Sequence, residues 1–203
     1  MYHASKVFDS VLRQIPAFLL LLLLTYCTVG PDIKSSYNSS SNFRVYQTYA
    51  WHSAELPTPT IGSGPAYSPL LDQQIKQAIE SELVKTGMRP AEESPDLLIA
   101  YDIALPATKA SEADFAPGFG YGYSYWYGYR FRYSVSGMPA YRSVSDLPPG
   151  TLIIDLIEAS TNQLVWRGWY EAEIDPTALG SYDLNKAIAN IMSSYPPVPQ
   201  TTR

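Results

Sequence analysis

The sequence is poor in the residues that build catalytic and metal sites. Its 203 residues include one cysteine, Cys27, and two histidines, His3 and His52. No C-x-x-C or H-x-x-H spacing occurs, which excludes the commonest zinc sites, and no G-x-S-x-G motif marks a serine nucleophile. A single cysteine also excludes a disulfide within the chain. The composition therefore predicts a protein that is not an enzyme and that binds no metal and no cofactor.

Charge is scarce as well. Charged residues make up 16% of the chain and hydrophobic residues 46%, so a sizeable core is expected. The formal net charge is −5. Residues 1–26 contribute +1 through Lys6, Arg13 and Asp9, which leaves −6 for the remainder. An acidic domain argues against a nucleic-acid partner, because such partners require a basic face.

No apolar run is long enough to span a membrane. The uncharged run Ile15–Tyr26 contains six consecutive leucines, whereas a spanning helix needs about 20 apolar residues. A short apolar run after Lys6 and Arg13 is typical of an export signal, and residues 1–26 are therefore predicted to be a signal peptide. The alternative is an N-terminal anchor helix that is not removed.

The end of this run resembles a bacterial lipobox. Leu24-Thr25-Tyr26-Cys27 places the cysteine where such a motif carries its lipid, and two or more acyl chains hold a protein stably on a membrane. Tyr26 departs from the motif, which usually has Gly, Ala or Ser there, so the efficiency of signal cleavage stays open. The predicted lipidation site is Cys27.

Hydrophobic periodicity predicts one α+β domain over residues 43–195. A Ser/Asn-rich tether precedes it at 27–42, and a tail follows at 196–203. The expected order is β-α-β-(β-β)-β-β-α, a mostly antiparallel sheet with two helices packed on one face. The expected strands are 43–51, 96–105, 141–144, 150–158 and 164–174, and the expected helices are 69–85 and 182–195.

The hairpin over residues 150–174 gives the clearest local signal. Asn162 lies in its turn, and alternation along the second strand predicts two faces. One face is expected to hold Leu164, Trp166, Tyr170, Ala172 and Ile174, and the other Arg167, Trp169, Glu171 and Glu173.

Four segments together resemble a known family. They are YQTYAW, PDLLIAYD, GTLIIDLIEASTNQLVWRGW and NKAIANIMSSYPP. The chain is similar over about residues 46–197 to bacterial envelope lipoproteins of the domain-of-unknown-function family numbered 4136. The resemblance implies a lipid-anchored protein of the cell envelope, and it implies no catalytic residue. Thr28 replaces the aspartate that usually retains lipoproteins in the inner membrane, which favours the outer membrane with the domain facing the periplasm.

An aromatic ladder lies within the Gly/Tyr-rich insertion at 115–137. Every odd position from 119 to 133 is aromatic, and an extended strand would place all of them on one face. This face is the candidate binding surface for a protein or glycan of the envelope. The alternatives are a structural strand or hairpin arm that covers the core, a contact with the membrane interface, and an unfolded tract. The residues are Phe119, Tyr121, Tyr123, Tyr125, Tyr127, Tyr129, Phe131 and Tyr133.

Asp155 is a carboxylate within a hydrophobic strand, between Ile154 and Leu156. Burial could raise its pKa, although such a residue more often has a structural role. The leading interpretation is a non-catalytic binding or scaffold module on a lipid anchor. The alternatives are a cell-wall hydrolase that uses carboxylates and a structural assembly part that pairs through a strand edge.

Overall fold

A mixed β-sheet organises the domain. The computed structural model describes residues 32–52, 69–104, 119–124, 129–139, 141–171 and 181–197, and for 119–132 the backbone alone. All of these residues lie within one compact unit, Pro31–Arg203. The predicted signal peptide and Cys27 lie outside the described residues, as do Tyr125 and Tyr127.

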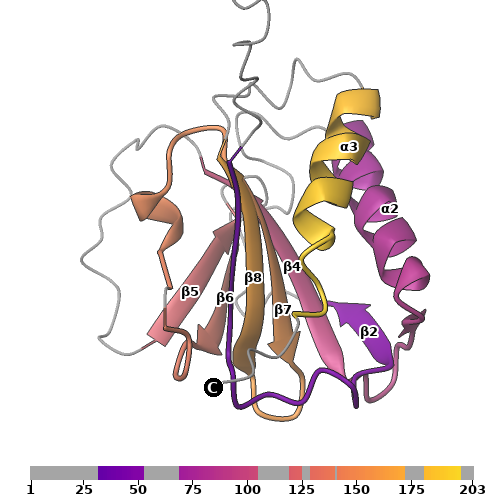
Figure 1. Cartoon of the computed structure of the whole chain (residues 1–203), viewed down its shortest axis with the longest axis vertical. Helices are drawn as coiled ribbons and strands as arrows, with labels where there is room; N and C mark the ends of the chain where they lie inside the picture. The colour runs from indigo at the N-terminus through magenta and orange to yellow at the C-terminus, as the bar shows by residue number, and fades with distance from the viewer. Residues whose placement is uncertain are drawn as a thin grey trace, which may run out of the picture. The chain divides into compact units, whose positions relative to one another are not determined.

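Eight strands form the sheet, in the order β3-β2-β4-β7-β8-β6-β5, and β1 also pairs with β8 (Figure 1). Their bounds are β1 (Asp32–Tyr37), β2 (Thr48–Trp51), β3 (Arg89–Pro90), β4 (Leu97–Ile103), β5 (Phe119–Ser124), β6 (Tyr129–Ser134), β7 (Leu152–Glu158) and β8 (Gln163–Glu171).

The prediction of a mostly antiparallel sheet is wrong, although the α+β class holds. Strand β2 pairs in parallel with β3 and β4, and β6 pairs in parallel with β8 through Ser134 and Gln163. The physical reason is the helix α2 (Pro69–Lys85) between β2 and β4. Parallel neighbours need a crossover connection of this kind, whereas a tight turn would make them antiparallel.

Both helices pack on one face of the sheet. Helix α2 buries Leu71, Ile75, Ile79 and Leu83 at helical spacing, as predicted. Helix α3 (Ser181–Met192) adds Leu184, Ile188 and Ile191 to the same core, in which Trp166 of β8 is also fully buried. Helix α3 is shorter than predicted, and Tyr195 packs into this core from beyond its end.

Helix α2 ends as its sequence predicts. Gly87 has a φ of 88°, in the left-handed region where glycine is favoured. The Met88 N–H donates to the Leu83 carbonyl at 3.1 Å and the Gly87 N–H to the Val84 carbonyl at 3.0 Å. These two bonds form a Schellman motif, which satisfies carbonyls left free by the last helical turn.

The predicted tether over residues 27–42 is wrong from Asp32 onward. Strand β1 pairs antiparallel with β8 along its whole length, from Asp32 opposite Glu171 to Tyr37 opposite Trp166. Main-chain hydrogen bonds form this pairing, so a polar Ser/Asn-rich segment can join a sheet without an apolar pattern. Phe43 then packs edge-to-face at 6.0 Å against Tyr37, Tyr46 and Tyr195, which fastens the following loop to the core.

A β-bulge changes the faces of strand β8. Leu156 pairs with Trp166 but Ile157 pairs with Leu164, so Val165 is an extra residue on β8. Val165 and Trp166 both join the helix-side core, and Leu164 packs on the opposite face. The predicted position of Leu164 beside Trp166 is therefore wrong, while Arg167 and Trp169 do face away from the helices.

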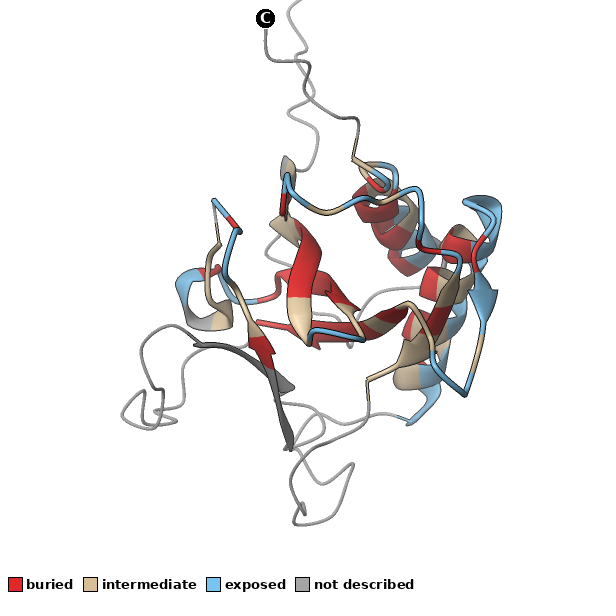
Figure 2. Ribbon diagram, turned by 90° about the horizontal axis from the view of Figure 1, so that it is seen from below, coloured by how far each residue is buried: buried red, intermediate tan, exposed pale blue. Residues whose placement is uncertain are grey.

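The second face of the sheet is covered by the segment from Tyr133 to Leu147 rather than by a helix (Figure 2). Tyr133 and Met138 pack against Ala100, Ile157 and Leu164. The predicted short strand at 141–144 is absent from this described segment, in which the 3-10 helix η2 (Val144–Asp146) forms instead.

Candidate functional site

The predicted aromatic ladder folds as two antiparallel strands, β5 and β6. Their register pairs Tyr121 with Arg132 and Tyr123 with Arg130, while Gly120 pairs with Tyr133. Directly paired residues of an antiparallel ladder belong to the same face. The aromatic positions of β5 therefore lie on the face opposite to those of β6, and the prediction of one face with eight rings is wrong. In one continuous strand all the odd positions would share a face. Because the chain reverses between β5 and β6, the odd positions of β6 lie on the other face.

Tyr133 at the end of the ladder is a core residue. Its side chain is fully buried, and its hydroxyl donates to Asp155 Oδ2 at 3.1 Å. The same hydroxyl accepts from Arg167 Nη2 at 2.5 Å. The structural interpretation of the ladder therefore applies at this position, and Tyr133 does not belong to an exposed binding face.

Asp155 and Arg167 form a buried ion pair beneath Tyr133. They are direct partners on β7 and β8, and their exposures are 3% and 0%. Arg167 Nε donates to Asp155 Oδ1 and Nη2 donates to Oδ2, both at 2.7 Å. This two-pronged geometry is the strongest that a guanidinium and a carboxylate can form.

The covering segment satisfies the rest of the guanidinium. Arg167 Nη1 donates to the Arg142 carbonyl at 2.5 Å, and Cζ lies 4.8 Å from the centre of the Tyr141 ring. The pair and its two tyrosines therefore connect β7, β8, β6 and the loop over the second face. We call Tyr133, Tyr141, Asp155 and Arg167 the buried polar cluster.

Burial sets the protonation states in this cluster. It raises the pKa of Tyr133 well above its ordinary value and also raises that of Tyr141, so both phenols stay neutral. Burial alone would lower the pKa of Arg167, but the adjacent Asp155 carboxylate raises it well above the usual value. The Arg167 guanidinium thus stays charged beside two neutral phenols, and both oxygens of Asp155 accept hydrogen bonds. Asp155 therefore lies between Arg167 and Tyr133 and joins β7 to β8 and β6.

A second polar cluster joins the covering loop to the sheet near the end of β8. Glu171 Oε1 accepts from Arg142 Nη1 at 2.8 Å and from Trp169 Nε1 at 2.9 Å, and Oε2 accepts from Lys34 Nζ at 3.2 Å. The bond from Trp169, together with Lys34 and Arg142, keeps the pKa of Glu171 below its ordinary value of 4.5. The sequence places Trp169 and Glu171 on one strand face, but the contacts with Lys34 and Arg142 depend on tertiary structure.

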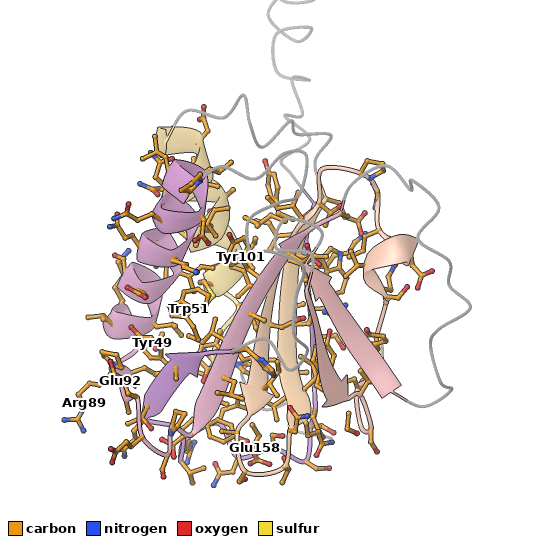
Figure 3. The ribbon with its side chains drawn as sticks, turned by 180° about the vertical axis from the view of Figure 1, so that it is seen from behind. Tyr49, Trp51, Arg89, Glu92, Tyr101 and Glu158 are labelled. Atoms are coloured by element: carbon orange, nitrogen blue, oxygen red, sulfur yellow. The ribbon has the colours of Figure 1, made fainter. Side chains whose placement is uncertain are left out.

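A third polar group lies where α2 meets the sheet. Trp51 and Tyr101 lie close together there (Figure 3), with ring centres 6.2 Å apart. Trp51 Nε1 donates to Glu80 at 2.7 Å, and the Tyr101 hydroxyl donates to Asp72 at 2.7 Å. Lys76 Nζ lies 3.2 Å from Asp72 and 5.5 Å from the Trp51 ring centre. These contacts satisfy the inward charges of α2 and fasten it to β2 and β4.

In the residues that the structure describes, no three or more His, Cys, Asp or Glu side chains come together in a group that could hold a metal ion. Among the same residues, no helix is long and apolar enough to cross a membrane.

A comparison with protein families now identifies the chain. The model of a family described as Domain of unknown function (DUF4136) matches residues 33–197. The chain belongs to this family. The resemblance seen in the sequence is thereby confirmed at the level of the DUF4136 domain. No curated protein matches the chain.

Solved structures agree at the level of the fold. A DUF4136 family protein from Bacteroides thetaiotaomicron has a TM-score of 0.51 at 15% identity, and the match covers 82% of this chain and 96% of that one. A PDZ domain protein from Parabacteroides distasonis has a TM-score of 0.48 at 16% identity, and the match covers 82% of this chain but only 35% of that one. A PelC dodecamer from Paraburkholderia phytofirmans has a TM-score of 0.38 at 11% identity, with coverage of 80% and 96%. The likeness to the DUF4136 family protein supports the fold.

Proposed function

We propose that this DUF4136 chain is a lipid-anchored, non-catalytic binding or scaffold module of the bacterial cell envelope. One observation carries the proposal. The family match begins at residue 33 and β1 at Asp32, five residues after Cys27. What precedes the domain is therefore a charged start, a short apolar run and a cysteine, the arrangement expected of a lipoprotein signal. The proposed location is the outer membrane, with the domain in the periplasm.

The short connection limits how far the domain stands from its anchor. Five residues reach at most about 18 Å when fully extended. A lipid on Cys27 would therefore keep the beginning of β1 close to the membrane surface. Strand β1 begins at the end of the sheet where β4 and β8 finish, because β4 and β8 both run antiparallel to β7, and β1 runs antiparallel to β8.

We assign partner binding to the β5–β6 hairpin without Tyr133. The support for this assignment is the rigid base of the hairpin, where Tyr133 joins the buried polar cluster and the Ser134 N–H donates to the Asn162 carbonyl at 2.9 Å. A fixed base presents a binding surface with little loss of conformational entropy. Aromatic residues suit a protein or glycan partner, because their rings supply large contact area. The proposed residues lie at positions on both faces of the hairpin, Phe119, Tyr121 and Tyr123 on one face and Tyr129 and Phe131 on the other, so a partner would contact the hairpin from two sides. Tyr125 and Tyr127, which lie outside the described residues, complete the set.

The anchor is tested by replacing its sulfur. Cys27→Ser should move the protein from the membrane fraction to the soluble periplasmic fraction, because the thiol accepts the lipid. Mass spectrometry of the mature N-terminus of the unaltered protein should find an acylated cysteine. An unmodified Cys27, or a Cys27→Ser protein that stays in the membrane, would contradict lipid anchoring and support an anchor helix.

The binding surface is tested separately by crosslinking and capture from intact cells. Replacement of Tyr121, Tyr123 and Tyr129 by Ser should abolish the captured partner and leave the urea midpoint unchanged. Tyr133→Phe is the matched control, because it should lower stability and retain capture. Loss of cooperative unfolding in the triple variant would instead place these rings in the core.

A further inference from the structure

Strand β1 has one edge that no other described strand covers. It pairs with β8 along its whole length (Figure 1), and the Asn38 N–H donates to the Val165 carbonyl at 2.9 Å. In an antiparallel pair, directly opposed residues exchange both main-chain bonds at every second position. Main-chain groups at the even positions of β1 therefore face β8. Those at the odd positions face away from it: Ile33, Ser35 and Tyr37.

These outward groups have no main-chain partner. Within the part of the chain that the structure describes, no hydrogen bond reaches the N–H or C=O groups of Ile33, Ser35 and Tyr37. Ser35, in the middle of the strand, is also exposed. Donors and acceptors therefore lie open along one side of β1, at the spacing that a neighbouring strand requires. We call this side the open edge.

Proteins usually protect such an edge, and β1 lacks the usual devices. Strand β3, at one end of the sheet, is protected by its length of two residues and by Pro90, which has no N–H. Strand β1 has six residues, no proline and an unbroken register with β8. Its one lysine, Lys34, donates to Glu171 of β8 at 3.2 Å, so this charge is held toward β8 and does not guard the open edge.

We propose that the open edge of β1 binds an extended segment of another protein, which joins the sheet as a further strand. Alternating main-chain donors and acceptors are matched group for group by the main chain of an extended polypeptide. A second copy of this chain is disfavoured, because two chains of net charge −5 repel each other. The occupant is therefore a strand of a different protein.

The two faces of β1 specify the side chains of that segment. Ile33 and Tyr37 are half-buried on the helix side, where Tyr37 packs against Phe43 at 6.0 Å, so apolar residues fit beside them. On the other face the Lys34 side chain is 40% exposed, and opposite charges stabilise a cross-strand pair. Because side chains alternate along a strand, the segment alternates apolar and polar residues, with an acidic residue beside Lys34.

The proposed function determines only where this edge lies. Strand β1 begins five residues after Cys27, so a lipid on Cys27 would hold the open edge close to the membrane surface. Strand addition itself does not require the anchor, and it should be the same in the Cys27→Ser protein.

Amide hydrogen exchange of the purified full chain tests whether the edge is open. The N–H groups of Ile33, Ser35 and Tyr37 should exchange at least about tenfold faster than those of Lys34 and Ser36, which face β8. Slow exchange at Ser35 in the purified chain would overturn the proposal, because another part of the same chain would then cover the edge.

A defined peptide tests strand addition. The probe is a synthetic peptide of alternating valine and serine with one central glutamate, used in about 0.5 M salt to screen the net charge of the chain. At saturation it should slow exchange of the Ser35 N–H at least about tenfold and leave that of Ser36 unchanged. No slowing at Ser35 would overturn strand addition. Lysine in place of the glutamate should weaken binding about threefold, and equal affinities would overturn the acidic preference.

Two variants complete the test. Ser35→Pro removes an outward N–H without removing a bond to β8, so it should abolish protection of Ile33 and Tyr37 by the peptide and leave the urea midpoint nearly unchanged. Ser35→Thr keeps the N–H and should bind like the unaltered chain. Undiminished binding by Ser35→Pro would overturn β1 as the site. Protection at Ser35 together with an unmodified Cys27 in the native protein would refute the proposed function and leave strand addition intact.

Discussion

At the scale of single residues, the best-defined feature is a charge pair buried on the side of the sheet away from the helices. Arg167 and Asp155 are among the least exposed residues of the chain, yet each makes charge-assisted bonds in good geometry. Such pairs contribute little net stability compared with apolar residues, but loss of one partner leaves an uncompensated charge. The cluster therefore acts as a specific connection that holds the segment of Tyr133 and Tyr141 in one place.

Asp155→Asn should destabilise the domain by about 3–5 kcal/mol, the usual effect of removing one partner of a buried pair. Urea unfolding measures the change. Replacing both partners, with Asp155→Leu and Arg167→Met, should destabilise less than Asp155→Asn alone, because no unpaired charge remains. If Asp155→Asn lowers the free energy of unfolding by less than about 1 kcal/mol, water must reach the guanidinium of Arg167 in that variant.

At the scale of elements, close packing decides how α3 lies on the sheet. Gly168 of β8 faces α3, and a Cβ atom there would lie 2.3 Å from the Trp166 ring and 2.7 Å from Ile191. The helix can approach β8 this closely only because no side chain intervenes. The close packing of α3 on β8 therefore requires a glycine at position 168. Hydrophobic periodicity does not predict this requirement.

Gly168→Ala should lower the unfolding free energy by about 1–3 kcal/mol through overpacking. Gly87→Asn is the matched control. A Cβ at Gly87 has nothing within 4 Å, so this variant adds only the backbone strain of a side chain at a positive φ. Asparagine tolerates that φ better than most residues, so its melting temperature should fall less than that of Gly168→Ala. Equal melting temperatures for Gly168→Ala and the unaltered protein would show that α3 can shift without loss.

At the scale of the whole molecule, two carboxylates fasten segments that are distant in the sequence. Asp96 accepts from the N–H groups of Gln47 and Thr48, each at 2.9 Å, and these bonds lower its pKa below 3.8. Glu171 joins β1 to the covering loop and also has a lowered pKa. Both groups stabilise the folded state only while they are ionised.

Stability should therefore fall as the pH drops from about 4.5 through the lower folded pKa values. The unfolded chain binds protons at these sites before the folded chain does, so acid favours unfolding. Glu171→Gln should flatten this acid limb in urea titrations at a series of pH values. The exposed Glu92→Gln should not flatten it. If the loss of stability at low pH is the same in Glu171→Gln as in the unaltered protein, Glu171 does not contribute to it.

The elements that depend on local periodicity and end signals can be read from the amino-acid sequence. These are helix α2 with its Gly87 cap, helix α3, strand β4 and the β7–β8 hairpin, together with membership of the DUF4136 family. Each is specified within about 20 residues by apolar spacing and by turn residues, which a single sequence displays directly.

The pairings between distant segments, in contrast, depend on how the whole chain packs. Strand β1 enters the sheet through main-chain hydrogen bonds that leave no side-chain pattern, and the Val165 bulge reverses the face of Leu164. The β5–β6 register separates the aromatic positions onto two faces, and Tyr133 is buried because Arg167 and Asp155 lie beneath it. Backbone groups are the same in every residue, so a strand's neighbour follows from how the whole chain fills space and satisfies its buried polar groups.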